Sequence, residues 1–371
     1  MKIGVPRETA PNERRVALVP ETVDRLVKKG HAILVEFGAG VEAGFTDDAF
    51  SAAGAQLTDS PSNADLVIRV HAPDEEQIKS LKAGTVAVSV LNARTSPDLV
   101  QSLADANVTA LAMELVPRIA RAQRMDVLSS QASLAGYKAV LIAANSLGKY
   151  LPMLMTAAGT IPPSRVLVLG AGVAGLQAIA TAKRLGAVVE AFDVRTAAAE
   201  QVESLGGRFL RMPESKDAEA AGGYARAQTD EEQERQRAFL KSHLAEADIV
   251  ITTAAIPGRR APLLVTKDMA EAMRPGSVVV DLAAETGGNV ELTVAGETII
   301  HNGIVLHGPI NVPSMMPLHA SLMYSRNIAA LLDLLIDKEG NLNLNLGDEV
   351  INAMCVAHAG EARHELGRKA G

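Results

Sequence analysis

Polar side chains interrupt an apolar stretch of the chain at residues 113–137, MELVPRIARAQRMDVLSSQASLAGY. Arg118, Gln123, Asp126 and Ser129 follow one another at spacings of five, three and three residues, which is too irregular for a single helical stripe. Their side chains offer hydrogen-bond donors and acceptors of several kinds. From these residues alone, the stretch is either a solvated polar loop or a set of polar groups arranged around a ligand.

The glycines of VLVLGAGVAGLQ form the strongest motif. Gly170, Gly172 and Gly175 make a GxGxxG pattern directly after a short apolar strand and directly before a helix. Gly170 permits a tight turn, Gly172 lets the backbone approach a pyrophosphate, and Gly175 lets the helix pack on the strand. The helix N-terminus then offers N–H groups to the anionic diphosphate. The pattern predicts a dinucleotide-binding fold.

Asp193 ends the next strand, VVEAFDV, about twenty residues further on, where the ribose-binding carboxylate of such folds belongs. A carboxylate that accepts hydrogen bonds from the ribose hydroxyls favours NAD and repels the 2′-phosphate of NADP, so these residues favour NAD(H). Arg195 could weaken this preference by pairing with a phosphate. We expect its side chain instead to lie on the adenine or to face solvent.

A charged insertion at residues 211–243 is long for a connection between a strand and a helix. Its centre, AGGYAR at residues 221–226, places Gly223 beside a lone Tyr224. One interpretation is a hinged loop, around residues 215–235, that is mobile when empty and closes over bound nucleotide through the tyrosine. The other is a surface excursion whose tyrosine has no role. The residues alone leave both interpretations open.

No pattern indicates metal or hydrolytic chemistry. The histidines lack HxH or HxxxH spacing and a cysteine partner, so we expect no metal site. The sequence contains neither a GxSxG motif nor a paired acidic motif for hydrolysis. Asp281 and Glu285 lie at or just past a strand end, where ligands bind in such sheets, but capping of the following loop is an equally good interpretation.

Composition excludes further classes. The net charge of −7 argues against nucleic-acid binding, which needs clustered Lys and Arg, and the chain has no Trp for base stacking. The single Cys355 excludes an internal disulfide and fits a reducing compartment. The N-terminus is charged and lacks the apolar core of a signal peptide. Residues 302–325 lack charged side chains but contain three prolines, so we expect no transmembrane span and a soluble, intracellular protein.

Strand-like and helical runs alternate in two series, which predicts the α/β class with two Rossmann-like, doubly wound parallel-sheet domains joined by long helices. Residues 130–312 should form the Rossmann domain. Residues 1–129 and 313–371 should form the N-terminal α/β domain, completed by the C-terminal helix LHASLMYSRNIAALLDLLID. Residues 129–150 have the apolar spacing of a long helix, and the prolines of LPMLMTAAGTIPPS should break the structure after it.

Long segments along almost the whole chain resemble the NAD(H)-binding subunit of proton-translocating nicotinamide nucleotide transhydrogenase. They are PRETAPNERRVALVP, MELVPRIARAQRMDVLSSQASLAGY, MTAAGTIPPSRVLVLGAGVAGLQAIATAKRLGA, ESLGG, AGGYA, ITTAAIPGRRAP and INVPS. The related alanine dehydrogenases share the two-domain fold and are the alternative assignment. A non-catalytic NAD-sensing module is a third class.

The resemblance to alanine dehydrogenase breaks at the residues that family uses for its chemistry. Arg69 stands where those enzymes have a lysine, and Asn92 stands where they have a histidine. Arg15 matches their carboxylate-binding arginine, so the site is only partly dismantled. Asn92 cannot shuttle a proton, and Arg69 stays protonated at any usable pH. Hydride transfer between two nicotinamide rings needs no separate proton transfer, so the transhydrogenase assignment tolerates both changes.

The transhydrogenase resemblance implies roles for the polar stretch. Arg118 would orient the nicotinamide-side ribose and phosphates, Gln123 would bridge towards the second nucleotide, and Asp126 with Ser129 would hold the ring. Tyr224 falls where the family has its mobile-loop tyrosine, which favours the closing loop. The remaining residues expected to contact NAD(H) are Gly170, Gly172, Val173, Ala174, Gly175, Asp193, Val194, Arg195, Gly223, Thr253 and Ala254.

The same resemblance implies an assembly. It implies a homodimer, docked to a membrane-spanning, proton-conducting subunit and to a separate domain that binds NADP(H). The chain would then lie in the cytoplasm, associated peripherally with the inner face of the cell membrane, and act as a transhydrogenase of the Si/Re-specific type.

Overall fold

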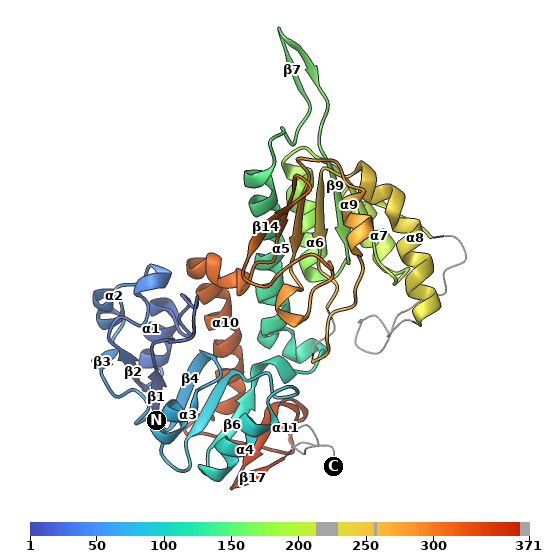
Figure 1. The fold of residues 1–371 in the computed structure, drawn as a ribbon. Coiled ribbons are helices and arrows are strands. Elements are labelled where there is room, and N and C mark those ends of the chain that lie inside the picture. The colour runs from blue at the N-terminus through green and yellow to red at the C-terminus, as the bar shows by residue number, and fades with distance from the viewer. Residues whose placement is uncertain (213–228, 256–257, 364–371) are drawn as a thin grey trace. The chain divides into compact units, whose positions relative to one another are not determined.

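The structure is a computed structural model, and it describes residues 1–212, 229–255 and 258–363. The chain divides into two compact units. Unit 1 comprises Met1–Gln131 and Pro313–Gly371, and unit 2 comprises Ala132–Val312. Figure 1 shows the elements of each unit as a ribbon.

Unit 1 is built on an eight-stranded sheet with the strand order β17-β16-β6-β5-β4-β1-β2-β3. Strands β1 to β6 pair in parallel, whereas β16 and β17 add antiparallel strands at one edge. The strands are β1 (Lys2–Val5), β2 (Ala32–Glu36), β3 (Gln56–Thr58), β4 (Leu66–His71), β5 (Val86–Val90), β6 (Thr109–Ala112), β16 (Cys355–His358) and β17 (Glu361–Ala362). β4, β5 and β6 are buried along almost their whole length, as expected of parallel strands covered on both faces.

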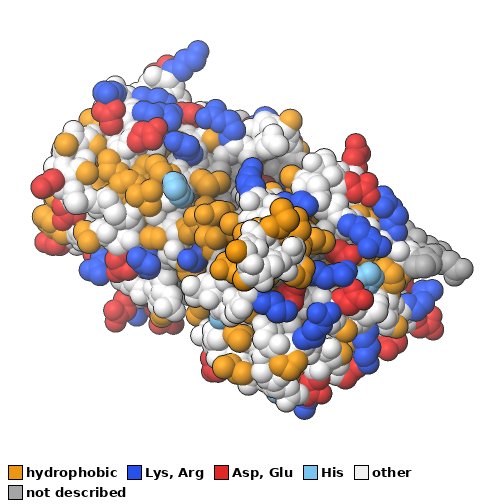
Figure 2. Space-filling model, turned by 90° about the horizontal axis from the view of Figure 1, so that it is seen from above, with side chains coloured by type: hydrophobic (Ala, Val, Ile, Leu, Met, Phe, Trp, Pro, Cys, Tyr) orange, Lys and Arg blue, Asp and Glu red, His pale blue; other side chains and the backbone are white. Residues whose placement is uncertain are grey.

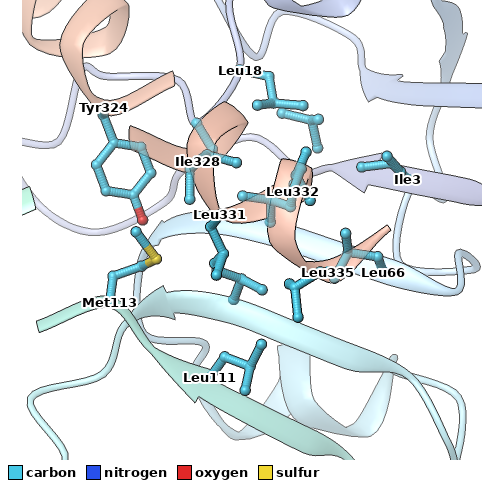
Figure 3. Close-up of a cluster of buried hydrophobic side chains, with 14 of the residues drawn as sticks. Ile3, Leu18, Leu66, Leu111, Met113, Tyr324, Ile328, Leu331, Leu332 and Leu335 are labelled. Carbon is cyan, nitrogen blue, oxygen red and sulfur yellow. The ribbon is translucent and has the colours of Figure 1, made fainter. Parts of the chain in front are cut away.

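Helices connect and cover these strands. They are α1 (Pro20–Lys28), α2 (Asp47–Ala52), α3 (Glu75–Lys79), α4 (Pro97–Asp105), α10 (Pro317–Leu335), α11 (Glu349–Met354) and the 3-10 turns η1 (Val41–Ala43), η2 (Met113–Leu115) and η3 (Ala120–Met125). Figure 3 shows how α10 fills the centre of this unit: Tyr324, Ile328 and Leu331 point into the same cluster as Ile3 and Leu111 of the sheet. Burying such side chains is the main force that holds α10 on the sheet.

Unit 2 is built on a seven-stranded sheet with the order β11-β10-β9-β12-β13-β15-β14. Its strands are β9 (Arg165–Leu169), β10 (Val188–Phe192), β11 (Arg208–Phe209), β12 (Ile249–Thr252), β13 (Val278–Asp281), β14 (Thr298–His301) and β15 (Ile304–His307). All neighbours pair in parallel except β14 and β15. The helices are α5 (Val127–Ser146, which contains the unit boundary), α6 (Val173–Arg184), α7 (Ala198–Ser204), α8 (Asp230–Glu246), α9 (Lys267–Glu271) and the 3-10 turns η5 (Ala284–Thr286) and η6 (Val312–Met315).

The expectation of an α/β fold is confirmed, and the structure corrects three details of it. An antiparallel strand pair, which was not predicted, closes one edge of each sheet. The segment expected to break structure after α5 forms a separate hairpin of β7 (Leu154–Thr156) and β8 (Gly159–Ile161), which is drawn as a projecting arm in Figure 1. The predicted loop 215–235 ends in helix, because a capping box of Thr229 and Glu232 starts α8 at Asp230.

One helix corrects the expectation that no segment qualifies as a membrane span. Among the described residues, α5 has the length and apolar composition of a membrane-crossing helix, with 33% of its apolar window buried. Its inner side packs in a unit 2 core cluster through Ala139, Val140 and Ala143. Core helices of soluble proteins meet the same test of length and composition, and this packing assigns that side of α5 to a protein core.

Candidate dinucleotide-binding site

The turn between β9 and α6 has the conformation that its three glycines were predicted to provide. Gly170 has φ of 100°, and a Cβ added to it would lie 2.7 Å from Oγ1 of Thr253. A Cβ added to Gly175 would lie 1.9 Å from the carbonyl oxygen of Gly170, so only glycine allows this approach of helix to strand. A Cβ on Gly172 would meet nothing within 4 Å, which leaves its backbone open to a ligand. The turn therefore fits the diphosphate of a dinucleotide.

The first turn of α6 contributes backbone donors to the same place. Gly172 is the N-cap residue and has no side chain with which to cap, so Val173 and Ala174 begin the helix with N–H groups that an anion can use. Sequence reasoning missed the element that supports this turn. Gly136 of α5 lies so close that an added Cβ would be 2.0 Å from the carbonyl oxygen of Ala174.

Asp193 follows β10 and lies beside the glycine turn. Its Oδ2 accepts a hydrogen bond of 2.7 Å from the backbone N–H of Ala171. The prediction for Arg195 was wrong: its side chain neither faces solvent nor lies free to cover an adenine, but pairs with Asp193 through Nε and Nη2 at 2.9 and 2.7 Å. The sequence spacing of two residues after a strand end makes this pair local, and only 18% of the Arg195 side chain is exposed. Val194, between them, is partly buried against a unit 2 core cluster.

The loop after β12 forms the facing wall. Thr253 donates from Oγ1 to the carbonyl oxygen of Gly170 at 3.0 Å, which joins this loop to the glycine turn. Asn289 holds the next residue on both sides: the N–H of Ala254 donates to its Oδ1 at 3.0 Å, and its Nδ2 donates to the carbonyl oxygen of Ala254 at 2.8 Å. Asn289 is fully buried and was missed, because its partners lie 35 residues earlier in the chain.

The two acids left open by the sequence now separate. Asp281 is fully buried and accepts hydrogen bonds from Thr252, Thr293 and the backbone N–H groups of Ala283, Asn289 and Val290. It therefore caps the following loop. Glu285 is exposed on that loop.

The polar stretch of unit 1 forms the 3-10 turn η3 and the start of α5. Asp126 accepts hydrogen bonds from both the N–H and the hydroxyl of Ser129, at 2.9 and 2.6 Å, as an N-cap of the helix. Arg118 and Gln123 are exposed on the same loop. The structure thus joins Asp126 to Ser129 and places the other two residues on one surface loop of unit 1.

A second missed residue, Asn327 of α10, supports this loop. Its Nδ2 donates to the carbonyl oxygen of Arg124 at 2.8 Å, and its Oδ1 accepts from the hydroxyl of Ser130 at 2.7 Å. Asn327 is 7% exposed and lies about 200 residues away in sequence, so no local pattern could reveal it. Gly223 and Tyr224, by contrast, lie outside the described residues.

The residues that matched alanine dehydrogenase positions lie in unit 1. Arg15 is buried and grips Glu13 with Nε and Nη2 at 2.8 and 2.6 Å. Arg69 is also buried, and burial lowers its pKa while the Glu8 carboxylate opposes that change. Asn92 is exposed, with a left-handed φ of 51°. An amide at this position offers no proton acceptor for amino-acid oxidation.

Comparison with known proteins agrees with the geometry. Residues 4–135 match the family model "Alanine dehydrogenase/PNT, N-terminal domain", and residues 139–365 match the model "Alanine dehydrogenase/PNT, C-terminal domain". The chain is 47% identical to an NAD(P) transhydrogenase subunit alpha chain of Rhodospirillum rubrum, over 98% of each chain. It is 33% identical to alanine dehydrogenase of Bacillus subtilis, over 85% of this chain and 81% of that one.

Solved structures give the same order of similarity. The crystal structure of transhydrogenase from Sinorhizobium meliloti superposes with a TM-score of 0.89 at 43% identity, covering 98% of this chain and 100% of that one. The resemblance inferred from the sequence motifs is confirmed by these matches, which together span nearly the whole chain. The chain belongs to the alanine dehydrogenase/PNT family, and within it lies nearer to the transhydrogenase alpha subunits than to the alanine dehydrogenases.

Proposed function

We propose that this chain is the NAD(H)-binding subunit of a proton-translocating transhydrogenase and transfers hydride between NADH and NADP⁺ held on a partner domain. The observation that carries the proposal is the glycine turn at Gly170–Gly175 beside Asp193, in a chain that is 47% identical to a transhydrogenase alpha subunit along its length. Asn92 and Arg69, in place of the groups of an amino-acid dehydrogenase, support this choice over alanine oxidation.

The residues have separable roles in this proposal. The Gly170–Gly175 turn, the first turn of α6 and Asp193 bind the diphosphate and adenosine ribose, with Thr253 and Ala254 on the facing wall. Bound NADH supplies the hydride. The catalytic residues proposed on the polar loop are Arg118, Gln123, Asp126 and Ser129, with Tyr224 from the region outside the described residues. They orient the nicotinamide, because alignment of the two rings is the main requirement of a reaction without a separate proton step.

The proposal includes partners. The hydride acceptor is NADP(H) on a separate domain, and a membrane-spanning subunit conducts protons. The relatives named as subunits of NAD(P) transhydrogenase support an assembly of more than one chain. The chain would act at the cytoplasmic face of the membrane, bound through these partners, in an enzyme of the Si/Re-specific type.

We further propose a homodimer, and the β7–β8 hairpin is its candidate contact. Met153, Met155 and Ile161 are 57%, 78% and 40% exposed on this hairpin. Figure 2 views the molecule from the end at which Figure 1 draws the hairpin, and hydrophobic side chains gather on that face. An isolated two-stranded hairpin is at best marginally stable in water, so a second copy that covers it would stabilise it.

The test separates the two enzyme functions. The purified chain should bind NADH, should not oxidise alanine with NAD⁺ at a useful rate, and should transfer hydride from NADH to NADP⁺ when mixed with an NADP(H)-binding partner. Gln123→Asn and Arg118→Ala should lower that rate more than they weaken NADH binding, by about a hundredfold for a 1 Å misplacement. Equal losses of rate and binding would make the loop an ordinary binding surface. Turnover of alanine by the unmodified chain would replace this proposal by the dehydrogenase assignment.

A further inference from the structure

The carboxylate of Asp193 has no hydrogen-bonding position left in this structure. Its Oδ1 accepts from the backbone N–H and the Nε of Arg195, both at 2.9 Å. Its Oδ2 accepts from Nη2 of Arg195 and from the N–H of Ala171, both at 2.7 Å. A carboxylate offers about four lone-pair positions, so these four donors saturate it. The ribose of a dinucleotide can reach Asp193 only after one donor leaves.

The two backbone donors cannot leave without rebuilding the glycine turn. The guanidinium of Arg195 can leave by rotating its side chain, and it lies on the more accessible side of the pair, 18% exposed against 5% for Asp193. We propose that Arg195 competes with the adenosine ribose for Asp193 and thereby sets how strongly the chain prefers NAD(H) to NADP(H). This inference rests on the proposed binding of NAD(H) and deepens it.

The competition acts oppositely on the two cofactors. For NADH, the ion pair must open before the ribose hydroxyls can donate to Asp193, so Arg195 weakens binding. For NADPH, the displaced guanidinium stays on its short tether, close to the 2′-phosphate, and its planar fork can hold phosphate by two hydrogen bonds. Arg195 therefore reduces the discrimination that a bare carboxylate would give, which is the reason for its place directly beside Asp193.

Substitution of Arg195 tests this, with titrations of NADH and of NADPH against the purified full chain. Arg195→Ala should bind NADH more tightly and NADPH more weakly, so that the ratio of the two dissociation constants changes by about tenfold or more, the effect of one charged hydrogen bond. Arg195→Lys keeps the charge without the fork. It should therefore also bind NADH more tightly but keep more of the affinity for NADPH.

Arg165→Ala is the matched control. It removes another arginine of unit 2, which pairs with Glu190 and Glu246 at 3.7 and 3.0 Å and lies at the first residue of β9, at the opposite end of that strand from the glycine turn. Its ratio should equal that of the unmodified chain. A loss of NADH affinity in Arg195→Ala would make Arg195 an ordinary nucleotide contact and overturn the inference, as would an unchanged ratio. Failure of the unmodified chain to bind NADH would overturn the proposed function and this inference with it.

Discussion

Glu13 shows how neighbours decide the charge of a buried acid. Its side chain is fully buried, and burial alone would raise its pKa. Hydrogen bonds from Arg15 and His71, with contacts of 2.6 Å to Oε2 from each, outweigh burial and hold the pKa well below its ordinary value of 4.5. Glu8, nearby in the same unit, has its pKa raised, because burial there outweighs a hydrogen bond from Val70.

A pH prediction follows for Glu13. A carboxylate whose pKa is depressed in the folded state stabilises the protein above its unfolded pKa, and this contribution is lost as pH falls. Acid should therefore lower the free energy of unfolding of the unmodified chain below pH 4.5, the ordinary pKa of a glutamate. Glu13→Gln should be less stable at neutral pH by about 3 kcal/mol, since Arg15 loses its charged partner, but should lose less on acidification.

Denaturant titrations between neutral pH and about pH 3.5 measure both effects. Glu285→Gln, at an exposed acid, serves as the control and should follow the unmodified chain. An acid dependence of Glu13→Gln as steep as that of the unmodified chain would show that other groups dominate it.

At the scale of elements, α5 positions the glycine turn through one contact. Gly136 lets α5 touch the first turn of α6, where an added Cβ would lie 2.0 Å from the carbonyl oxygen of Ala174. Gly136→Ala should push the two helices apart, lower stability by about 1–3 kcal/mol and weaken NADH binding. Gly148→Ala is the control, because its added Cβ would meet nothing within 4 Å. Thermal unfolding and NADH titration of both variants check this, and equal behaviour of the two would contradict it.

The helix α10 supports the polar loop in a comparable way. Asn327→Ala removes the hydrogen bonds to Arg124 and Ser130 that hold η3 and the start of α5. If the loop aligns the nicotinamide, hydride transfer should fall by about tenfold while NADH binding changes little. Arg326→Ala, at the adjacent and 65% exposed residue, should change neither. Parallel loss of rate and NADH affinity in Asn327→Ala would assign the loop to binding alone.

These elements also show what the sequence could predict. The glycine turn and Asp193 follow from local spacing, since a strand, a turn and a helix within thirty residues define their geometry. Gly136, Asn289 and Asn327 escaped because each acts on a partner that is distant in sequence. The Arg195 pair was local but misjudged, because the choice between solvent and a neighbouring carboxylate depends on side-chain geometry that spacing does not encode. The β7–β8 hairpin was missed because prolines flank it.

At the scale of the whole molecule, the exposed methionines of the hairpin require an explanation that one copy of the chain does not provide. Met155 is 78% exposed on a two-stranded arm, and such arms are stable when another surface covers them. If the proposed homodimer uses this arm, Met155→Asp places a charge in its apolar contact, which disfavours association. Sedimentation should then give half the mass of the unmodified chain, or a dimer that dissociates at about tenfold higher concentration. Ile300→Asp, at a 75% exposed residue of β14, matches the change in exposure and chemistry and should leave the mass unaltered. Retention of the full mass by Met155→Asp would remove the hairpin from the interface, and a monomeric unmodified chain would remove the homodimer itself.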